Sequence, residues 1–173
     1  MNIFIEKLKD IDAESLRMFE IENRDFFEEM VPSRGDDYYK PDVFKLRHDA
    51  LLKEQRKGTS IFYVIKDENN SILGRINLVD IDKQSQIGFL GYRVGYKHTG
   101  KGIAKKALQL LLEKIDKLDI KEIKAKTTTN NIASQKVLEK NGFERIEVDD
   151  EVFEMKNRTL KFVHYKWSSQ KNF

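Results

Sequence analysis

A glycine-rich stretch from Gly91 to Leu108 contains the residues whose types and spacing point most directly to chemistry. Gly100 and Gly102 have no side chains, so the main chain can turn tightly there and bring several N–H groups against phosphate oxygens. The helix expected to follow adds the positive end of its dipole. Four lysines supply further charge beside the same loop: Lys97, Lys101, Lys105 and Lys106. The stretch therefore predicts a pyrophosphate-binding loop, although it lacks the full motif of either common nucleotide loop.

A second stretch, from Asn130 to Phe143, predicts a short amphipathic helix that ends at Gly142. Its inward-facing apolar residues are Ile132, Val137 and Leu138. Ser134 precedes Leu138 by four residues, so its hydroxyl lies on the same face of the helix. Ser134 is therefore a candidate for hydrogen bonding a reacting group, and a plain serine on the helix surface fits the pattern equally well.

Together the two stretches resemble the GNAT superfamily of N-acetyltransferases. The loop motif of that superfamily, Gln/Arg-x-x-Gly-x-Gly/Ala, is similar to Lys97-x-x-Gly100-x-Gly102. Its helix motif, Asn-x-x-Ala-x-x-x-Tyr-x-x-x-Gly-Phe, is similar to Asn131-x-x-Ser134-x-x-x-Leu138-x-x-x-Gly142-Phe143. The three departures (Lys, Ser and Leu) are familiar in the Rim-type ribosomal-protein-alanine N-acetyltransferases. Segments that also resemble this branch are Leu90-Gly91-Tyr92, Gly100-Lys101-Gly102, Glu22–Phe27 and Pro32-Ser33-Arg34.

The resemblance implies acetyl-CoA as co-substrate, direct attack by an amine, and no metal. It implies a cofactor site formed by Tyr92, Arg93, Val94, Thr99, Gly100, Lys101, Gly102, Ile103, Ala104, Asn131 and Ser134. Two of these are the candidate catalytic groups: the N–H of Val94 would stabilise the developing oxyanion, and the hydroxyl of Ser134 would assist the departing thiolate. The candidate acceptor-binding residues are Asn23, Arg24 and Tyr92.

No carboxylate stands where many relatives have a glutamate just before the Leu-Gly-Tyr segment, because this chain has Phe89 there. A protein α-amine has a pKa of about 7.7 to 8.0, so a sizeable fraction is neutral near pH 7. A lysine amine, with a pKa of about 10.4, is neutral only about one time in a thousand. A site without a strong base therefore matches protein N-termini, with water relayed to Asp80 or Glu28 as an additional route for the proton.

Other charged side chains have less specific meanings. An acidic run comprises Glu20, Glu22, Asp25, Glu28 and Glu29. It could attract a basic protein N-terminus, and a solvated helix face is the more common explanation. His98 is expected to be a solvated loop side chain. His48 and His164 have no partners at metal-ligand spacing, so no zinc site is expected.

The elements that must position these residues follow from hydrophobic periodicity and turn residues. Strands are predicted at 3–8, 61–65, 72–81, 86–94, 122–127, 144–148 and 162–167, and helices at 13–27, 41–56, 101–117 and over the second motif. Residues 33–40 are predicted to be a loop. This order predicts a mixed sheet covered by helices, in the α/β or α+β class. The resemblance adds the GNAT fold, with about seven mostly antiparallel strands, four or so helices, and a central strand pair that splays near Arg93.

Length favours one domain over residues 1–173. The absence of cysteine excludes a disulfide framework and a thiol nucleophile. The 32 basic and 29 acidic residues leave a net charge of +3, too little to favour direct nucleic-acid binding. The N-terminal segment has no long apolar run, so neither a signal peptide nor a membrane span is expected, and we expect a cytoplasmic protein. Edge strands near the C-terminus could pair copies into a homodimer or a higher homo-oligomer.

The sequence thus predicts an acetyl-CoA-dependent N-acetyltransferase of Rim-like type that acts on the α-amine of a protein, with a ribosomal protein as first candidate. Two alternatives stay open. One is an N-acetyltransferase for a small amine such as a polyamine or aminoglycoside, which needs clustered acidic residues in an open pocket. The other is a CoA-binding domain without turnover, which the absent tyrosine and glutamate would suggest.

Overall fold

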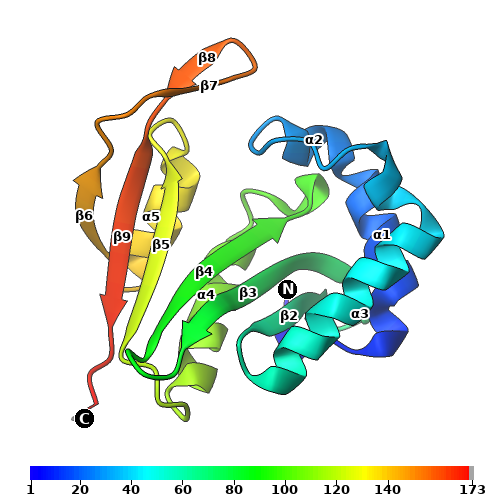
Figure 1. Ribbon diagram of the computed structural model, residues 1–173, viewed down its shortest axis with the longest axis horizontal. Coiled ribbons are helices and arrows are strands. Elements are labelled where there is room, and N and C mark those ends of the chain that lie inside the picture. Colours follow the sequence, from blue (N-terminus) through cyan, green and yellow to red (C-terminus); the bar gives the residue numbers. More distant parts are fainter. Residues whose placement is uncertain (172–173) are drawn as a thin grey trace.

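Seven strands form the central sheet of the computed structural model, which describes residues 1–171 (Figure 1). In spatial order they are β1 (Ile3–Lys7), β2 (Ile61–Asp67), β3 (Ile72–Asp82), β4 (Ile87–Val94), β5 (Glu122–Thr128), β9 (Phe162–Ser168) and β6 (Glu144–Val148). Neighbouring strands are antiparallel except β4 and β5, which run parallel. The predicted mixed, mostly antiparallel sheet is therefore confirmed.

The parallel pair in the middle of the sheet separates after three residue pairs. Strands β4 and β5 are in register at Ile87↔Glu122, Gly88↔Ile123 and Phe89↔Lys124, and no further pairs follow. Beyond Phe89, β4 stays paired with β3 and β5 stays paired with β9, so the two halves of the sheet diverge (Figure 1). The predicted splay is present, and it begins after Phe89 rather than near Arg93.

Helices cover both faces of the sheet (Figure 1). One face carries α4 (Ile103–Ile115) and α5 (Ile132–Lys140), and the other carries α1 (Ala13–Glu22), α2 (Arg24–Glu28) and α3 (Pro41–Lys57). The buried residues of α4 are spaced four, one, three and four positions apart, at Ile103, Ala107, Leu108, Leu111 and Ile115. This spacing lines up one apolar stripe, which packs on the sheet and forms the larger of two buried clusters.

The predicted helix over residues 13–27 is divided in two at Asn23. The backbone of Asn23 leaves the helical region, with φ −102° and ψ 6°. Its side-chain Nδ2 donates to the Phe19 carbonyl at 2.9 Å, and its Oδ1 accepts from the Tyr96 N–H at 2.8 Å. Asn23 thus ties the end of α1 to the segment that follows β4, a long-range contact that helical periodicity does not reveal.

Two further local differences come from backbone conformation. Helix α4 begins at Ile103 rather than 101, because Gly102 has φ +76° and cannot continue a right-handed helix. A hairpin of β7 (Phe153–Met155) and β8 (Arg158–Leu160) was not predicted. Its turn, Lys156-Asn157, has positive φ at both residues but lacks the glycine that usually signals such a turn. The predicted loop over 33–40 includes a 3-10 helix, Asp36–Tyr39.

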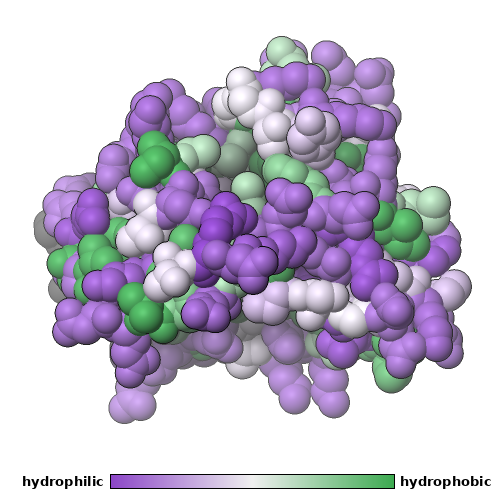
Figure 2. Space-filling model, turned by 90° about the horizontal axis from the view of Figure 1, so that it is seen from above, coloured by the Kyte–Doolittle hydropathy of each residue, from purple (hydrophilic) through white to green (hydrophobic). Residues whose placement is uncertain are grey.

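The face of the molecule seen from above Figure 1 is largely hydrophilic (Figure 2). In the view from above Figure 1, hydrophobic side chains appear in small groups separated by hydrophilic ones (Figure 2). Within residues 1–171, no helix is both long enough and apolar enough to span a bilayer.

Candidate active site

Two hollows meet at Gly91, Tyr92 and Arg93 of β4, in the part of the strand that has left β5. The first, which we call the loop groove, has a volume of about 450 Å³ and is lined by the glycine loop, the starts of α4 and α5, and the diverging parts of β4 and β5. The second, the arginine hollow, has a volume of about 480 Å³ and lies toward α1 and α3. A molecule in each hollow would therefore meet the other across the same three residues of β4.

The glycine loop presents backbone N–H groups to the loop groove. Gly100 and Gly102 both have left-handed φ, +72° and +76°, and an added Cβ would meet nothing at either position. Gly102 precedes the first turn of α4 without a side-chain cap, so the N–H groups of Ile103, Ala104 and Lys105 have no intrahelical partner. The predicted cofactor residues that line the groove here are Thr99, Gly100, Gly102, Ile103 and Ala104. Lys101 does not line it, and Lys97 is paired with Glu22 at 2.7 Å.

The diverging end of β4 directs main-chain groups into the same groove. The Gly95 N–H donates to the Leu73 carbonyl at 2.9 Å, on the β3 side of the strand. Because alternate residues of a strand direct their N–H groups to opposite sides, the Val94 N–H points away from β3, toward the open edge. The predicted oxyanion donor is therefore oriented toward the groove.

A hydrogen bond joins the two walls of the loop groove. The Tyr92 hydroxyl lies 2.7 Å from the Ser134 Oγ, and the Ser134 N–H donates to the Asn131 Oδ1 at 3.1 Å. Burial raises the pKa of Tyr92, and the hydrogen bond with Ser134 partly offsets this rise. Tyr92 is therefore protonated at neutral pH. Leu138, which replaces the tyrosine of the superfamily motif, is buried in the core and brings no acid to the groove.

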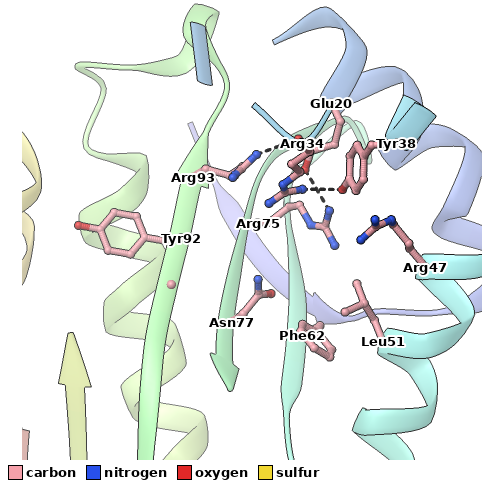
Figure 3. A pocket seen from close by; sticks show the side chains of 11 residues that line it. Glu20, Arg34, Tyr38, Arg47, Leu51, Phe62, Arg75, Asn77, Tyr92 and Arg93 are labelled. Carbon is pink, nitrogen blue, oxygen red and sulfur yellow. Dashed lines mark hydrogen bonds and ion pairs between the residues drawn. The ribbon is translucent and has the colours of Figure 1, made fainter. Parts of the chain in front are cut away.

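The arginine hollow is built from charged side chains of several elements (Figure 3). Glu20, only 1% exposed, accepts from Nη1 of Arg75 and from Nη1 of Arg93, each at 3.0 Å. Arg34 Nη1 donates to the Tyr38 hydroxyl at 2.5 Å. Burial lowers the pKa of Arg93, while Glu20 raises it and the charges of Arg34 and Arg75 lower it further. Tyr92 points to the opposite side of β4, so its hydroxyl belongs to the loop groove (Figure 3).

Several residues singled out from the sequence lie elsewhere. Asn23 and Arg24 line neither hollow. Arg24 pairs with Glu28 at 2.9 Å and with Asp36 at 2.7 Å, and Glu28 also accepts from Ser33. Asp80 lines neither hollow. These contacts give Arg24, like Asn23, a role within the fold.

Three of the five residues of the acidic run form ion pairs with other residues of the chain. Glu20 pairs with two arginines, Glu22 with Lys97 and Glu28 with Arg24. The hollow that Glu20 lines is therefore basic rather than acidic, contrary to an attraction for basic N-termini. This outcome depends on arginines from β3 and β4, which lie more than fifty residues away in the chain.

The histidines are also placed differently from expectation. His98 is half-buried, lines the loop groove, and its Nδ1 is buried without a partner among residues 1–171, so it is not a solvated side chain. His48 is buried, with Nε2 2.8 Å from the Lys9 carbonyl. His164 Nε2 lies 2.7 Å from Asp149 Oδ1, within hydrogen-bond distance, and Glu147 is close enough for the three potential ligand atoms to lie within 4.8 Å of one another. Pairing of β6 with β9 brings them together, which sequence spacing does not show.

Comparison with known proteins identifies the family. Residues 2–144 match the family described as Acetyltransferase (GNAT) domain. The chain belongs to the GNAT acetyltransferase family. It is an enzyme that transfers acetyl groups, as named N-acetyltransferases among its relatives also indicate.

Two curated relatives and one solved structure illustrate the likeness. The chain is 32% identical over 149 residues to the probable N-acetyltransferase YjcK of Bacillus subtilis, covering 83% of this chain and 81% of the relative. It is 25% identical over 146 residues to the [ribosomal protein uS5]-alanine N-acetyltransferase of Escherichia coli, covering 83% and 75%. The structure of RimL, a ribosomal-protein α-N-acetyltransferase, in complex with coenzyme A superposes with a TM-score of 0.87 at 16% identity, covering 97% of this chain and 94% of that one.

Proposed function

We propose that this GNAT enzyme transfers the acetyl group of acetyl-CoA directly to the α-amine at the N-terminus of a protein. The observation that carries the proposal is the meeting of the loop groove and the arginine hollow at Gly91–Arg93 of β4. The loop groove would hold the acetyl-CoA and the arginine hollow the acceptor. Positioning two reactants in this way can supply several kcal/mol of the barrier.

The residues of the loop groove fit coenzyme A. The glycines and the uncapped first turn of α4 offer N–H groups for the pyrophosphate, and the dipole of α4 supports its charge. The open edge of β4 offers main-chain groups to the pantetheine, and the Asn131 amide, whose Oδ1 caps α5, keeps its Nδ2 for the same arm. The complex of RimL with coenzyme A supports a cofactor on this fold.

The protein would then have two tasks at the reacting atoms. The Val94 N–H, directed toward the open edge, would donate to the acetyl oxygen as negative charge develops there. The Tyr92 and Ser134 hydroxyls, 2.7 Å apart, would pass a proton to the departing thiolate. Tyr92 thus supplies, from β4, the phenol that the motif position Leu138 lacks.

The acceptor amine would lose its proton without a dedicated carboxylate. Glu20 is the only carboxylate that lines either hollow among residues 1–171, and it is paired with two arginines. Positive charge near an ammonium group lowers its pKa, because it disfavours the charged form. An α-amine, with its ordinary pKa of about 7.7 to 8.0, would therefore be largely neutral in this hollow at pH 7.

The alternatives find less support. A polyamine or aminoglycoside site needs clustered free carboxylates, whereas the arginine hollow has four arginines and one paired glutamate. A CoA-binding domain without turnover needs no proton donor, whereas Tyr92 and Ser134 are joined in the groove. The uS5-alanine acetyltransferase of Escherichia coli makes a ribosomal protein the first candidate acceptor, which this enzyme would meet in the cytoplasm.

Thiol release from acetyl-CoA tests the proposal, measured with N-terminal peptides of ribosomal proteins, the same peptides with a blocked α-amine, and spermidine. Turnover is expected only with free α-amines. Ser134→Ala and Tyr92→Phe should each lower kcat about 100-fold, since one positioned proton donor contributes about that factor. Turnover on spermidine alone, or CoA binding without any turnover, would contradict the proposal.

Tyr165→Phe is the matched control. Tyr165 is buried and its hydroxyl donates to Glu139 of α5 at 2.9 Å, but it does not line the loop groove. The Tyr165→Phe variant therefore removes a tyrosine hydroxyl that is hydrogen bonded to α5, the helix of Ser134, and leaves the lining of the loop groove unchanged. Its kcat should stay within about twofold of the unmodified enzyme.

A further inference from the structure

The charge of the arginine hollow indicates what the acceptor carries besides its amine. Within residues 1–171, Arg34, Arg47, Arg75 and Arg93 line the hollow and Glu20 is the only acid there, so the formal excess is three positive charges. We infer that the arginine hollow binds an acidic side chain of the acceptor polypeptide, within about three residues of the amine that is acetylated. The inference rests on the proposed function and adds the acceptor sequence that it selects.

Glu20 uses only part of the donor capacity of the two inner arginines. A guanidinium group has five N–H donors, and Glu20 accepts from one nitrogen of Arg75 and one of Arg93. Arg75 is 7% exposed, and the rest of its guanidinium faces the hollow (Figure 3). A buried cation is stable when it is paired and hydrogen bonded, so a second carboxylate would complete this group.

The two outer arginines have no carboxylate partner among residues 1–171. Arg34 donates to the Tyr38 hydroxyl, and Arg47 lies over the Tyr38 ring, 5.5 Å from its centroid. Nearby acids are already used: Asp36 pairs with Arg24 and Asp37 with Lys40. Arg34 and Arg47 therefore remain available to a ligand, both beside the Tyr38 ring.

Register along the sheet fixes the spacing between amine and acid. Asn77 is paired with Gly91, and Arg75, two residues earlier in β3, is paired with Arg93. The Asn77 Oδ1 is buried, lines the hollow and has no partner among the described residues, so it can accept an N–H from the acceptor next to the reacting strand. The proposed oxyanion donor is the N–H of Val94, which is paired with Gly74 next to Arg75. The amine would therefore lie close to the arginines, and two residues of an extended acceptor span about 7 Å, which places the acid at its second or third position.

The test uses peptides that begin with alanine and carry glutamate or glutamine at position two, three or four. The enzyme should prefer glutamate over glutamine at position two or three by at least about tenfold in kcat/KM, as a charge-assisted hydrogen bond allows. The Arg34→Gln/Arg47→Gln double variant should reduce this ratio toward one. Arg47→Glu should move the preference toward lysine at the same position.

Arg56→Gln is the matched control, because Arg56 is an exposed arginine of α3 that does not line the hollow. It removes the same charge from the same helix and should keep the full preference for glutamate. Equal use of glutamate and glutamine peptides, or a preference that survives in the double variant, would overturn the inference and leave α-amine acetylation standing. No transfer to any peptide would overturn the proposed function itself, and this inference with it.

Discussion

The loop groove and the arginine hollow lie on opposite sides of β4 and are built from different parts of the polypeptide. At the glycine loop, the groove uses backbone N–H groups and left-handed glycines from one continuous stretch that runs from β4 into α4. The rest of its lining comes from α2 and the residues after it, β5, α5 and β9. The hollow uses side chains from α1, α3, β3, β4 and the segment before α3. Backbone groups suit a ligand that is the same for every enzyme of the family. Side chains can be substituted without altering the fold, so they suit a site that determines which acceptor is bound.

The buried charge cluster is where the arginine hollow supports the fold. Replacing Glu20 by alanine leaves Arg75 and Arg93 without their shared carboxylate, in positions that are 8% and 21% exposed at the side chain. Removing one partner of a buried ion pair costs about 3 to 5 kcal/mol. We expect a loss of this size in the free energy of unfolding, measured by urea denaturation. It is the largest effect expected from a single substitution at either hollow.

Glu22→Ala serves as its control, since Glu22 is on the same helix and pairs with Lys97, where the side chains are 57% and 74% exposed. Exposed pairs contribute little, so stability should be almost unchanged. If both variants lost the same stability, helix α1 rather than the buried charge cluster would be responsible. The ion pairs of Glu20 with Arg75 and Arg93 would then not be a specific source of stability.

Glycine substitutions should separate the two sides of β4. Gly102→Ala forces a side chain into left-handed backbone, at a cost of about 1 to 2 kcal/mol, and should weaken acetyl-CoA binding about tenfold. Gly91→Leu should act on the other side, because an added Cβ meets nothing there and the side chain would occupy the arginine hollow. We expect its effect mainly in the KM of the acceptor peptide. Isothermal titration and steady-state kinetics measure the two effects.

Gly58→Ala controls for backbone strain, because Gly58 also has φ +76° but ends α3, away from both hollows. It should lose similar stability and bind acetyl-CoA normally. A parallel loss of cofactor affinity in Gly58→Ala would mean that general destabilisation explains the Gly102 result. Acetyl-CoA binding would then not depend specifically on the left-handed backbone of Gly102.

The same contrast explains what the sequence could predict. The strand–loop–helix layout of the glycine stretch, the helix of the second motif and most strands were correctly predicted, because glycine spacing and hydrophobic periodicity act within short continuous segments. Ile132, which was expected to face inward, is instead exposed at the first turn of α5. The splay of β4 from β5 was expected from the family resemblance and is present. Local signals were weaker for the β7–β8 hairpin, whose three-residue strands and Lys-Asn turn carry no strong signature.

Contacts between distant segments could not be predicted in this way. The Tyr92–Ser134 hydrogen bond spans 42 positions, and Glu20 meets Arg75 and Arg93 across 55 and 73 positions. Strand alternation places Arg75, Asn77, Gly91 and Arg93 on one face only when the register of β3 with β4 is known. The basic character of the hollow therefore became visible only in the fold.

The pH dependence of kcat offers the finest test of the difference between the two sides. If the hollow lowers the pKa of the bound amine, removing a positive charge must raise that pKa and move the acidic limb of kcat to higher pH. For one partly solvated charge about 8 Å away, the shift is about 0.3 to 0.5 unit. Arg47→Gln should show it, Arg56→Gln should not, and added salt should reduce it.

The identity of the titrating group can be settled with acceptors. If the titrating group is the acceptor amine, an acceptor whose amine pKa is lower by about one unit should shift the acidic limb of the kcat profile to lower pH by about the same amount. A protein carboxylate acting as base would hold the limb fixed for all acceptors, because its pKa belongs to the enzyme. A fixed limb would therefore contradict a hollow that works by charge alone, and would point to Glu20 as the base, since it is the one carboxylate among residues 1–171 that lines the hollow.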